Sequence, residues 1–404
     1  MVAPLVLLVT YALIAGRRWK LLPIGRPSGA LLGAVLMVAL GGVTPSGAYA
    51  LLDLPTLALL LGMLIIAAVL DQDGHMDTIV GLLVRGDPTP RALLVRLALV
   101  AAAGSAALMN DTVCLVLAPA IVRLCVRRGL PLTPYLLALA TSSNLGSAAT
   151  LIGNPQNMLI AGASGLSFLD FAARAGPGVL AALPVHLGLL LGVYGKDLPA
   201  RMSPDAEPTT TRAPSARTLV LTVAGVVAMA LGADLGWTAL ATATALLVAR
   251  RQDPAPVLAK ADWPVLLLFA GLFVVVGAAR GSPELMGIIG TVAAPGAAGV
   301  LGWTGGLVVA SNVVSNVPLV MLLAPGLAAS HAAPSTWALL GFVTTVAGNL
   351  TLIGSVANLL VAEAAKAHHD LGFFEYLRFG ALTTLVTLAV GVPAVLAMGW
   401  LLDG

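Results

Sequence analysis

Charged residues are scarce in this sequence. They make up 10% of the 404 residues, whereas hydrophobic residues make up 59% and the mean hydropathy is +0.99. Soluble domains average about 25% charged residues, and so few charges cannot cover a surface that faces water. A water-soluble fold is therefore excluded, and most of the chain is expected to face lipid or other transmembrane helices.

Cysteine is almost missing as well, with only Cys114 and Cys125 present. Two cysteines at this spacing form neither a disulfide framework nor a metal-type cluster, so we expect no metal site. On one helix they would lie about 16 Å apart, too far to share one metalloid atom. Cys114 could contact a thiophilic substrate, but a free cysteine is more often a small core residue.

The groups that an intramembrane enzyme needs are also lacking. The sequence has no HExxH zinc motif, no serine near the membrane histidine His186 along the chain, and no acidic residue near Asp111 along the chain. We therefore predict a protein without catalytic residues or a cofactor. The pI of about 9.1 does not indicate a nucleic-acid partner, because the basic residues occupy short loops between apolar runs.

The chain instead contains many apolar runs of the length that crosses a lipid bilayer, about 20 residues. Two runs, 92–123 and 286–330, are too long for one crossing and are interrupted near the middle by polar residues. We predict that both are re-entrant hairpins, which enter and leave the membrane on one side. The remaining runs predict crossings at 2–15, 29–44, 54–70, 134–161, 175–194, 217–233, 236–249, 263–279, 336–362 and 380–401.

The basic residues agree with this topology. With the N-terminus outside and both hairpins re-entrant, only Arg174 and Arg280 of the 21 lysines and arginines fall outside. This matches the positive-inside rule, and a single crossing by either long run would break the match. We expect both termini outside, in the plasma (cytoplasmic or inner) membrane, with the first run retained rather than cleaved as a signal peptide.

Three sequence blocks recur in the same order on either side of a polar linker at 196–216. They predict an internal repeat, with a first unit at 1–195 and a second at 217–404. Each unit has five crossings and one hairpin, so the second unit is inverted, a pattern typical of secondary transporters. The blocks are Asp53-Leu54-Pro55 with Asp262-Trp263-Pro264, Asn110–Pro119 with Asn316–Pro325, and Leu151-Ile152-Gly153 with Leu352-Ile353-Gly354.

Polar breaks interrupt both hairpins and both of the runs 134–161 and 336–362, which we predict to be broken helices. Backbone that leaves a helix within the membrane must be buried in protein or line a wet cavity. A single asparagine often only joins helices, but four matched breaks favour a binding site. The predicted substrate-binding residues are Asn110, Thr112, Ser143, Asn144, Gly153, Asn154, Asn157, Ser315, Asn316, Asn349, Thr351, Gly354, Ser355 and Asn358.

Asp111 is the only carboxylate at a break. An acid at membrane depth is costly, so we predict that Asp111 carries the coupling proton or binds a coupling cation such as sodium. The second hairpin has Val317 where the first has Asp111. The two predicted half-sites are therefore chemically unequal, and no Arg or Lys is expected at the membrane midplane.

The blocks Asn110-Asp111-Thr112 and Ser142 to Asn157, which ends in Gly-Asn-Pro-Gln-Asn, resemble the ion transporter superfamily. This superfamily includes arsenite-efflux permeases, citrate and dicarboxylate transporters, and sodium/proton antiporters. The motifs are most similar to those of plant silicon-efflux transporters. The resemblance covers nearly the whole chain.

The resemblance implies a homodimer in which each subunit has a scaffold domain and a transport domain that moves like an elevator. In sodium-coupled carboxylate relatives, Ser-Asn-Thr at each hairpin tip binds sodium and substrate. Here the tips contain Asn110-Asp111-Thr112 and Ser315-Asn316-Val317, so an acid replaces a neutral residue in one tip and a hydroxyl is missing from the other. This departure favours proton coupling over sodium coupling.

The leading hypothesis is a proton-coupled efflux permease for a small neutral metalloid hydroxide, such as arsenite, antimonite or silicic acid. The alternatives are a sodium- or proton-coupled anion or carboxylate carrier and a sodium/proton antiporter. A channel is disfavoured because paired hairpins in inverted repeats indicate alternating access. The sequence leaves open whether an ATPase subunit joins the protein.

Overall fold

The computed structural model describes residues 2–15, 25–204, 214–283, 285–287 and 299–403, and within these ranges the chain is helical and has no strands. The prediction of an all-α chain is therefore confirmed. Parts of the predicted hairpin 286–330 and of the predicted linker 196–216 lie outside the described residues. The helices of the first half are α1 (Val2–Ala15), α2 (Arg26–Ala39), α3 (Pro45–Ala50), α4 (Leu54–Gln72), α5 (His75–Val84), α6 (Pro90–Ala107), α7 (Asn110–Arg127), α8 (Leu132–Ser147), α9 (Pro155–Ser164) and α10 (Phe168–Tyr194).

The second half has a closely similar order of helices. Its elements are α11 (Ala216–Ala230), α12 (Leu235–Arg250), α13 (Ala255–Lys260), α14 (Trp263–Ala279), α16 (Gly299–Val314), α17 (Asn316–Ala329), α18 (Pro334–Ala347), α19 (Val356–Ala365) and α20 (Phe373–Asp403). Within the described ranges, four helices, α4, α6, α10 and α20, are long and apolar enough to cross a membrane. Several others are shorter apolar helices of 10–17 residues.

Short helices arise where the sequence carries a local stop signal. The apolar run 29–44 was predicted as one crossing, but α2 ends at Ala39 because Gly41 adopts φ +75°. Glycine takes this left-handed conformation without a Cβ penalty, and its N–H and that of Gly42 cap the carbonyls of Val38 and Met37. The end of α2 therefore follows from the backbone conformation of Gly41, although the apolar sequence continues past Ala39.

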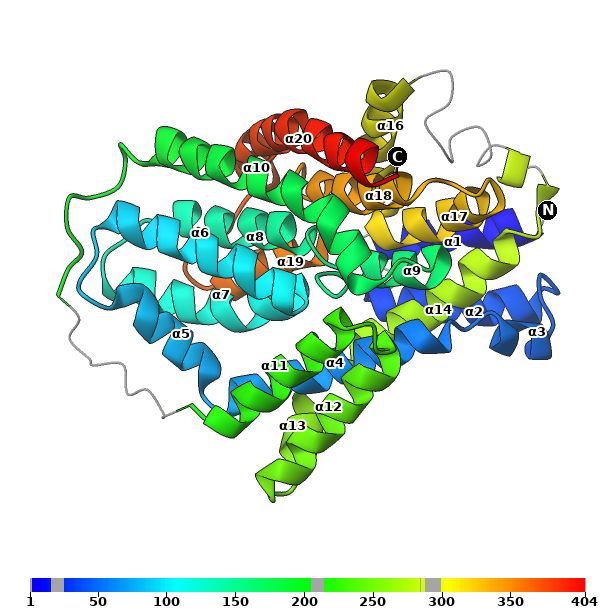
Figure 1. Ribbon diagram of the computed structural model, residues 1–404, viewed down its shortest axis with the longest axis horizontal. Coiled ribbons are helices and arrows are strands. Elements are labelled where there is room, and N and C mark those ends of the chain that lie inside the picture. Colours follow the sequence, from blue (N-terminus) through cyan, green and yellow to red (C-terminus); the bar gives the residue numbers. More distant parts are fainter. Residues whose placement is uncertain (1, 16–24, 205–213, 284, 288–298, 404) are drawn as a thin grey trace.

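The ranges predicted as hairpins and broken helices contain pairs of helices separated by short non-helical segments. α6 and α7 are separated by Leu108 and Met109, and α16 and α17 by Ser315. α8 and α9 are separated by 148–154, and α18 and α19 by 348–355. Figure 1 shows α6 and α7 side by side, with the start of α7 pointing toward the middle of the molecule.

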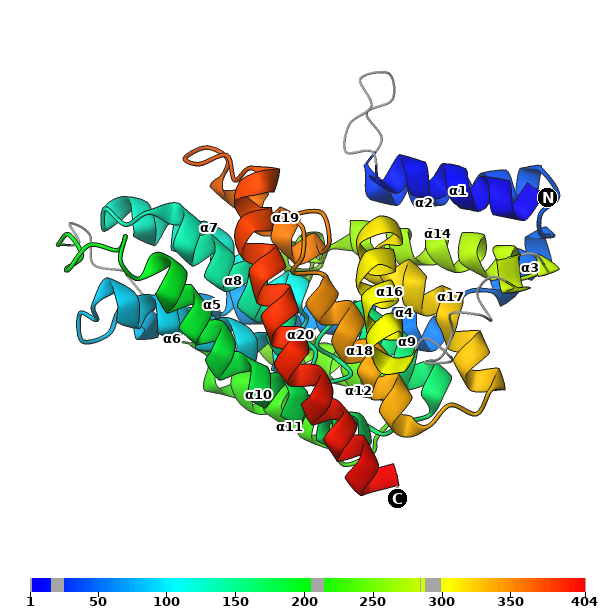
Figure 2. The ribbon, with the colours of Figure 1, turned by 90° about the horizontal axis from the view of Figure 1, so that it is seen from above.

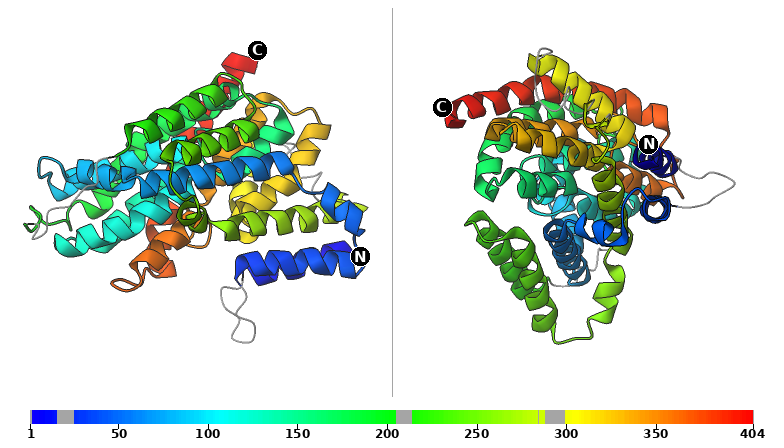
Figure 3. Two further views of the ribbon diagram at one scale, coloured as in Figure 1. Left: turned by 90° about the horizontal axis from the view of Figure 1, so that it is seen from below. Right: turned by 90° about the vertical axis from the view of Figure 1, so that its right-hand side faces the viewer.

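Two groups of helices pack among themselves. The central group consists of α6–α10 and α16–α20, where α20 lies across α10 and α18 (Figure 2). The peripheral group consists of α1, α2, α4 and α11–α14, and Figure 3 shows α11 and α12 leading away from the central helices. Within the central group α8 and α18 form the core, because every residue in 134–147 and 337–347 is buried.

The peripheral group contains two equivalent close contacts, α4 on α12 and α14 on α2. A Cβ atom on Gly62 of α4 would lie 2.5 Å from the backbone of Ala239, and one on Gly271 of α14 would lie 2.6 Å from that of Ala30. Small residues allow helices to approach this closely within a membrane. Gly62 and Gly271 each lie nine residues after the aspartate of the recurring Asp-x-Pro block, Asp53 and Asp262, so the repeat in the sequence corresponds to a repeated helix contact.

We expect Gly62→Ala and Gly271→Ala each to lower stability by about 1–3 kcal/mol, because the new methyl group meets rigid backbone. The measurement is the thermal unfolding midpoint of the purified protein in detergent. Gly188→Ala in α10 is the matched control, since no atom lies within 4 Å of a Cβ there. Unfolding midpoints that fall equally in all three variants would contradict the assignment of these two contacts.

Candidate functional site

Four helices of the central group begin at one cavity of about 60 Å³, here called the site cavity. The first residues of α7, α9, α17 and α19 line it together with residues of α1, α2 and α14 from the peripheral group. A cavity of this size holds roughly four to six waters, at about 10–15 Å³ each. Its polar lining consists of Arg26, Asn110, Asp111, Gln156, Ser315, Asn316 and Ser355.

The helix starts give the site cavity its electrostatic character. The N-terminus of a helix carries unpaired N–H groups and about half a positive charge. Four such ends converge here, and Asp111 occupies the first turn of α7. The arrangement favours the binding of oxygen-rich groups.

Asn144 of α8 joins two of the four breaks through its side-chain amide. Its Oδ1 accepts hydrogen bonds from Asn110 Nδ2 (2.9 Å) and Ser355 Oγ (3.0 Å). Its Nδ2 donates to Asn349 Oδ1 and Asn358 Oδ1, both at 2.9 Å. All five side chains are buried, so this network fixes the first hairpin tip against the second broken helix.

The directions of these hydrogen bonds follow from the backbone. Asn358 Nδ2 donates to the carbonyls of Gly348 (2.8 Å) and Thr351 (3.0 Å), and carbonyls can only accept. Asn358 must therefore present its oxygen to Asn144, which must present its nitrogen in return. Asn144 Oδ1 is then left to face Asn110, whose nitrogen must donate to it. The orientation of Asn110, usually ambiguous for an amide, is thus determined.

Because the nitrogen of Asn110 donates to Asn144, its oxygen Oδ1 is the atom that faces the site cavity. The Oδ1 atoms of Asn110 and Asn316 are both buried, and neither has a hydrogen-bond partner among the described residues. The two asparagines are equivalent in the repeat, come from the two hairpin tips, and line the same cavity. A buried acceptor without a partner costs about 1–3 kcal/mol, so these two oxygens mark a place where a ligand would be stabilised.

The second tip also stores backbone strain. Ser315 has φ +74° and ψ 154°, a conformation that is essentially restricted to glycine. Met109, which precedes α7 in the first tip, has φ −73° and ψ 136°. The two hairpin tips therefore differ in backbone conformation as well as in side chains.

Arg26 brings a positive charge to the site cavity, although its place in the sequence predicts a position in a cytoplasmic loop. It is the first residue of α2, and its charge acts on the carboxyl group of Asp111. Arg26 lies far from Asp111 along the chain, so no local pattern indicates that the two residues share a site. The site therefore combines an acid from the central group with a base from the peripheral group.

Several residues predicted to bind substrate support the breaks instead of lining the site cavity. Asn157 Nδ2 donates to the carbonyl of Thr150 (2.9 Å), as Asn358 does to that of Thr351. Ser143 bonds to Ser105 Oγ (2.7 Å), and Asn154 Nδ2 donates to Thr345 Oγ1 (2.9 Å).

Of three further predicted residues, Thr351 and Gly153 lie outside the site cavity and Gly354 lines it. Thr351 Oγ1 donates to Asn312 Oδ1 (2.8 Å). Gly153 allows close backbone approach, since a Cβ there would lie 2.2 Å from the carbonyl oxygen of Ser147. A Cβ on Gly354, which lines the site cavity, would lie 2.7 Å from Asn312 Oδ1.

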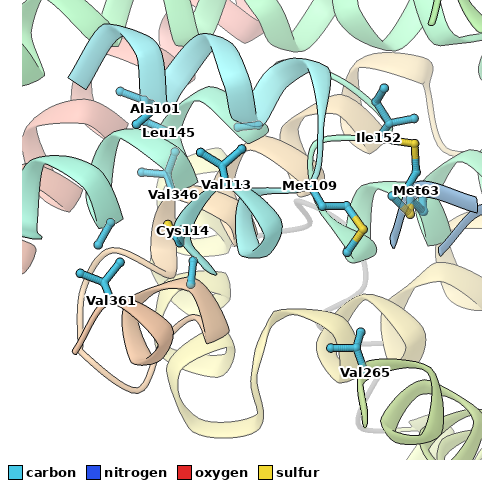
Figure 4. Packing of buried hydrophobic residues seen from close by; sticks show 14 of the residues in the cluster. Met63, Ala101, Met109, Val113, Cys114, Leu145, Ile152, Val265, Val346 and Val361 are labelled. Atoms are coloured by element: carbon cyan, nitrogen blue, oxygen red, sulfur yellow. The ribbon is translucent and has the colours of Figure 1, made fainter. Parts of the chain in front are cut away.

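Sequence reasoning missed Gln156, which lines the site cavity and whose Nε2 donates to Thr345 Oγ1 (3.1 Å). Its place between Pro155 and Asn157 in the most distinctive motif of the chain was the available signal. Cys114 is fully buried in apolar packing with Val113, Val346 and others (Figure 4), outside the site cavity. No cluster of three potential metal ligands occurs among the residues described.

The chain is similar in sequence and in fold to known membrane transporters. The family model described as a citrate transporter matches residues 9–347. The silicon efflux transporter LSI3 of Oryza sativa subsp. japonica is 35% identical, over 93% of each chain. A Dictyostelium discoideum protein that carries the transporter name arsB is 28% identical, over 94% of this chain and 89% of its own. The YdaH transporter of Alcanivorax borkumensis, at 16% identity, shares the fold with a TM-score of 0.54 over 99% of this chain and 96% of that one.

Proposed function

The chain belongs to the citrate transporter family, and from that premise we propose that it exports a small neutral metalloid hydroxide in exchange for protons. It is a secondary transporter in the membrane, and its family consists of transporters, not enzymes. Arsenous acid, its antimony analogue and silicic acid are the solutes of this class. The name of the rice relative, a silicon efflux transporter, and the name arsB both support this choice.

The observation that carries the proposal is the pair of unpartnered oxygens, Asn110 Oδ1 and Asn316 Oδ1, in one small cavity. A metalloid hydroxide presents several O–H donors around one centre. Two amide oxygens from opposite hairpin tips, together with the carboxylate of Asp111, provide acceptors for these donors. A carboxylate substrate would need donors at the same places, and the amide network points the nitrogen of Asn110 away from the cavity.

The exchange with protons follows from the chemistry of Asp111. Its carboxylate accepts a hydrogen bond from the bound solute, and hydrogen bonds to charged groups contribute about 1.5–3 kcal/mol. Protonation removes the charge and converts one oxygen into a donor, which weakens solute binding. Solute and proton therefore compete for one side chain, and this competition couples their movements in opposite directions.

The finer architecture belongs to the same proposal. The units 1–195 and 217–404 act as inverted repeats, the central group is the transport domain, and the peripheral group is the scaffold of a homodimer. The site cavity moves with the central group in an elevator-like step. Both termini lie outside the plasma (cytoplasmic or inner) membrane. The similar order of helices in the two halves and the paired Gly62 and Gly271 contacts support this arrangement.

One observation favours a second candidate, a proton- or sodium-coupled anion carrier. Arg26 and four helix N-termini line the site cavity, and each favours a negative charge. When Asp111 is protonated, these groups leave the cavity positively charged. The family description as a citrate transporter is consistent with this candidate.

We expect purified protein in proteoliposomes to take up arsenite or silicic acid when the lumen is acidic, with no requirement for sodium. The measurement is solute accumulation under an imposed pH gradient, with a sodium gradient and citrate in parallel experiments. Empty liposomes and a collapsed pH gradient are the controls. Strict sodium dependence with citrate would replace the proposal by the second candidate. Sodium-dependent proton movement without any added solute would indicate a sodium/proton antiporter.

A further inference from the structure

A second cavity of about 340 Å³, here called the outer cavity, lies beside the site cavity. It is bounded by α4, α7 and α13 and by the residue that precedes α14. Its charged lining consists of Asp71, Arg123, Lys260 and Asp262. Asp71 and Lys260 form an ion pair of 2.9 Å, and their side chains are 31% and 53% exposed. The outer cavity is therefore polar at its rim and accessible to water.

The outer cavity and the site cavity meet at two helix starts. In the first turn of α7, Asp111 lines the site cavity and the next residue, Thr112, lines the outer cavity. At the start of α14, Asp262 lines the outer cavity and Val265 lines the site cavity. These two residues are one helical turn, about 5 Å, apart along the axis. The two carboxyl groups lie close enough to interact electrostatically.

Asp262 differs from its repeat equivalent, Asp53, in how its carboxylate is used. Asp53 caps α4, accepting hydrogen bonds from Thr56 N (3.0 Å) and Thr56 Oγ1 (2.9 Å). Asp262 precedes α14 in the same Asp-x-Pro block, and its carboxylate interacts with the backbone N–H of Val265, but this contact is not a full capping hydrogen bond and Val265 supplies no hydroxyl. A full cap contributes about 1 kcal/mol, so capping accounts for less of the role of Asp262 than of the role of Asp53.

We infer that Asp262 relays protons between the outer cavity and Asp111, an inference that rests on the proton coupling proposed above. A proton from water in the outer cavity binds the Asp262 carboxylate. The O–H bond of Asp262 then breaks as a new O–H bond forms on Asp111 through an intervening water. Asp262 regains its negative charge and can be loaded again, so the step needs no further reactant.

The charges around Asp262 suit this role. Asp71 of α4 is paired with Lys260 of α13, which leaves Asp262 as the other acid of the outer cavity. Arg123 of α7 lines the same cavity as Asp262, and Arg26 of α2 lines the site cavity with Asp111. Each of the two acids therefore shares its cavity with an arginine.

The test compares two transport modes of Asp262→Asn in proteoliposomes, with arsenite and silicic acid as separate probes. Solute flux driven by a pH gradient should fall by roughly tenfold or more, since a positioned proton donor commonly contributes this much to a transfer rate. Solute-for-solute exchange at equal pH on both sides needs no net proton movement and should stay within about twofold of wild type. Asp262→Glu, which keeps a carboxyl group, should restore most of the pH-driven flux.

Asp234→Asn is the matched control, because Asp234 is an acid that precedes another peripheral helix, α12, and lines neither of the two cavities. Wild-type pH-driven flux in Asp262→Asn would overturn the relay, and so would an equal loss of both transport modes. If Asp262→Asn does not fold, Asp262→Ser gives the same comparison. Failure of the proposed function is a separate result, in which Asp111→Asn transports solute with an unchanged response to pH.

Discussion

Replacing Asp111 with asparagine is expected to abolish transport driven by a pH gradient and to remove the pH dependence of any residual flux. The amide is uncharged at every pH, so it cannot exchange a proton, and it offers one acceptor where the carboxylate offers two. Loss of a hydrogen bond to a charged acceptor, about 1.5–3 kcal/mol, weakens apparent solute affinity by about 10- to 100-fold. The measurement is the initial rate of solute uptake in proteoliposomes across a range of pH and solute concentration.

Asp111→Glu separates the loss of the proton-binding group from a general disturbance of the hairpin tip. This variant keeps a carboxyl group, so its flux should still respond to pH, although the longer side chain occupies part of a cavity of only about 60 Å³. Equal thermal unfolding midpoints for wild type and both variants would show that the fold is intact. A pH response in Asp111→Asn equal to that of wild type would remove Asp111 from the coupling mechanism.

The positions of the helices and of their interruptions could be predicted because each has a local cause. Apolar runs determine where helices form, and polar residues with glycine or proline determine where they stop. The segments between α8 and α9 and between α18 and α19 fall within the ranges that the sequence marked as broken. The end of α2 at Ala39 was not predicted, because it depends on the left-handed conformation of Gly41 and not on any change in polarity.

The site itself was only partly predictable, because its partners come from distant parts of the chain. The sequence identified Asn110, Asn144, Asn349 and Asn358 as polar residues at breaks, but it could not show which of them bond to each other. Arg26 was assigned to a loop by its charge, yet it shares the site cavity with Asp111. Such pairings depend on tertiary packing between helices, and local patterns in a single sequence carry no signal for them.

The repeat is least regular at α8 and α18, where Asn144 occupies the position that corresponds to Thr345. Asn154 in the first break bonds to Thr345, and Ser355 in the second break bonds to Asn144. Each break is therefore bonded to the buried helix of the other half, the first break to α18 and the second to α8. Asn144 alone continues this contact to a hairpin tip, through Asn110. The network is therefore centred on the half that also carries Asp111.

Asn144→Leu is accordingly expected to abolish transport and to lower stability by an amount on the order of 5 kcal/mol. The change leaves Asn110 Nδ2, Ser355 Oγ, Asn349 Oδ1 and Asn358 Oδ1 without this partner in a buried setting. Each unpaired buried group costs about 1–3 kcal/mol, and the total is comparable to the whole stability of many proteins. The measurements are the thermal unfolding midpoint in detergent and the rate of solute uptake.

Thr345→Val is the matched control for Asn144→Leu, because it removes a hydroxyl at the equivalent position of the other half. It leaves only Asn154 Nδ2 and Gln156 Nε2 without their shared acceptor, so its unfolding midpoint should fall by about half as much. It also leaves the bond between Asn110 and Asn144 in place, and with it the orientation of the Asn110 oxygen toward the site cavity. We therefore expect Thr345→Val to retain measurable pH-driven transport where Asn144→Leu has none. Equal losses in the two variants would show that orienting the Asn110 oxygen is not what Asn144 contributes to transport.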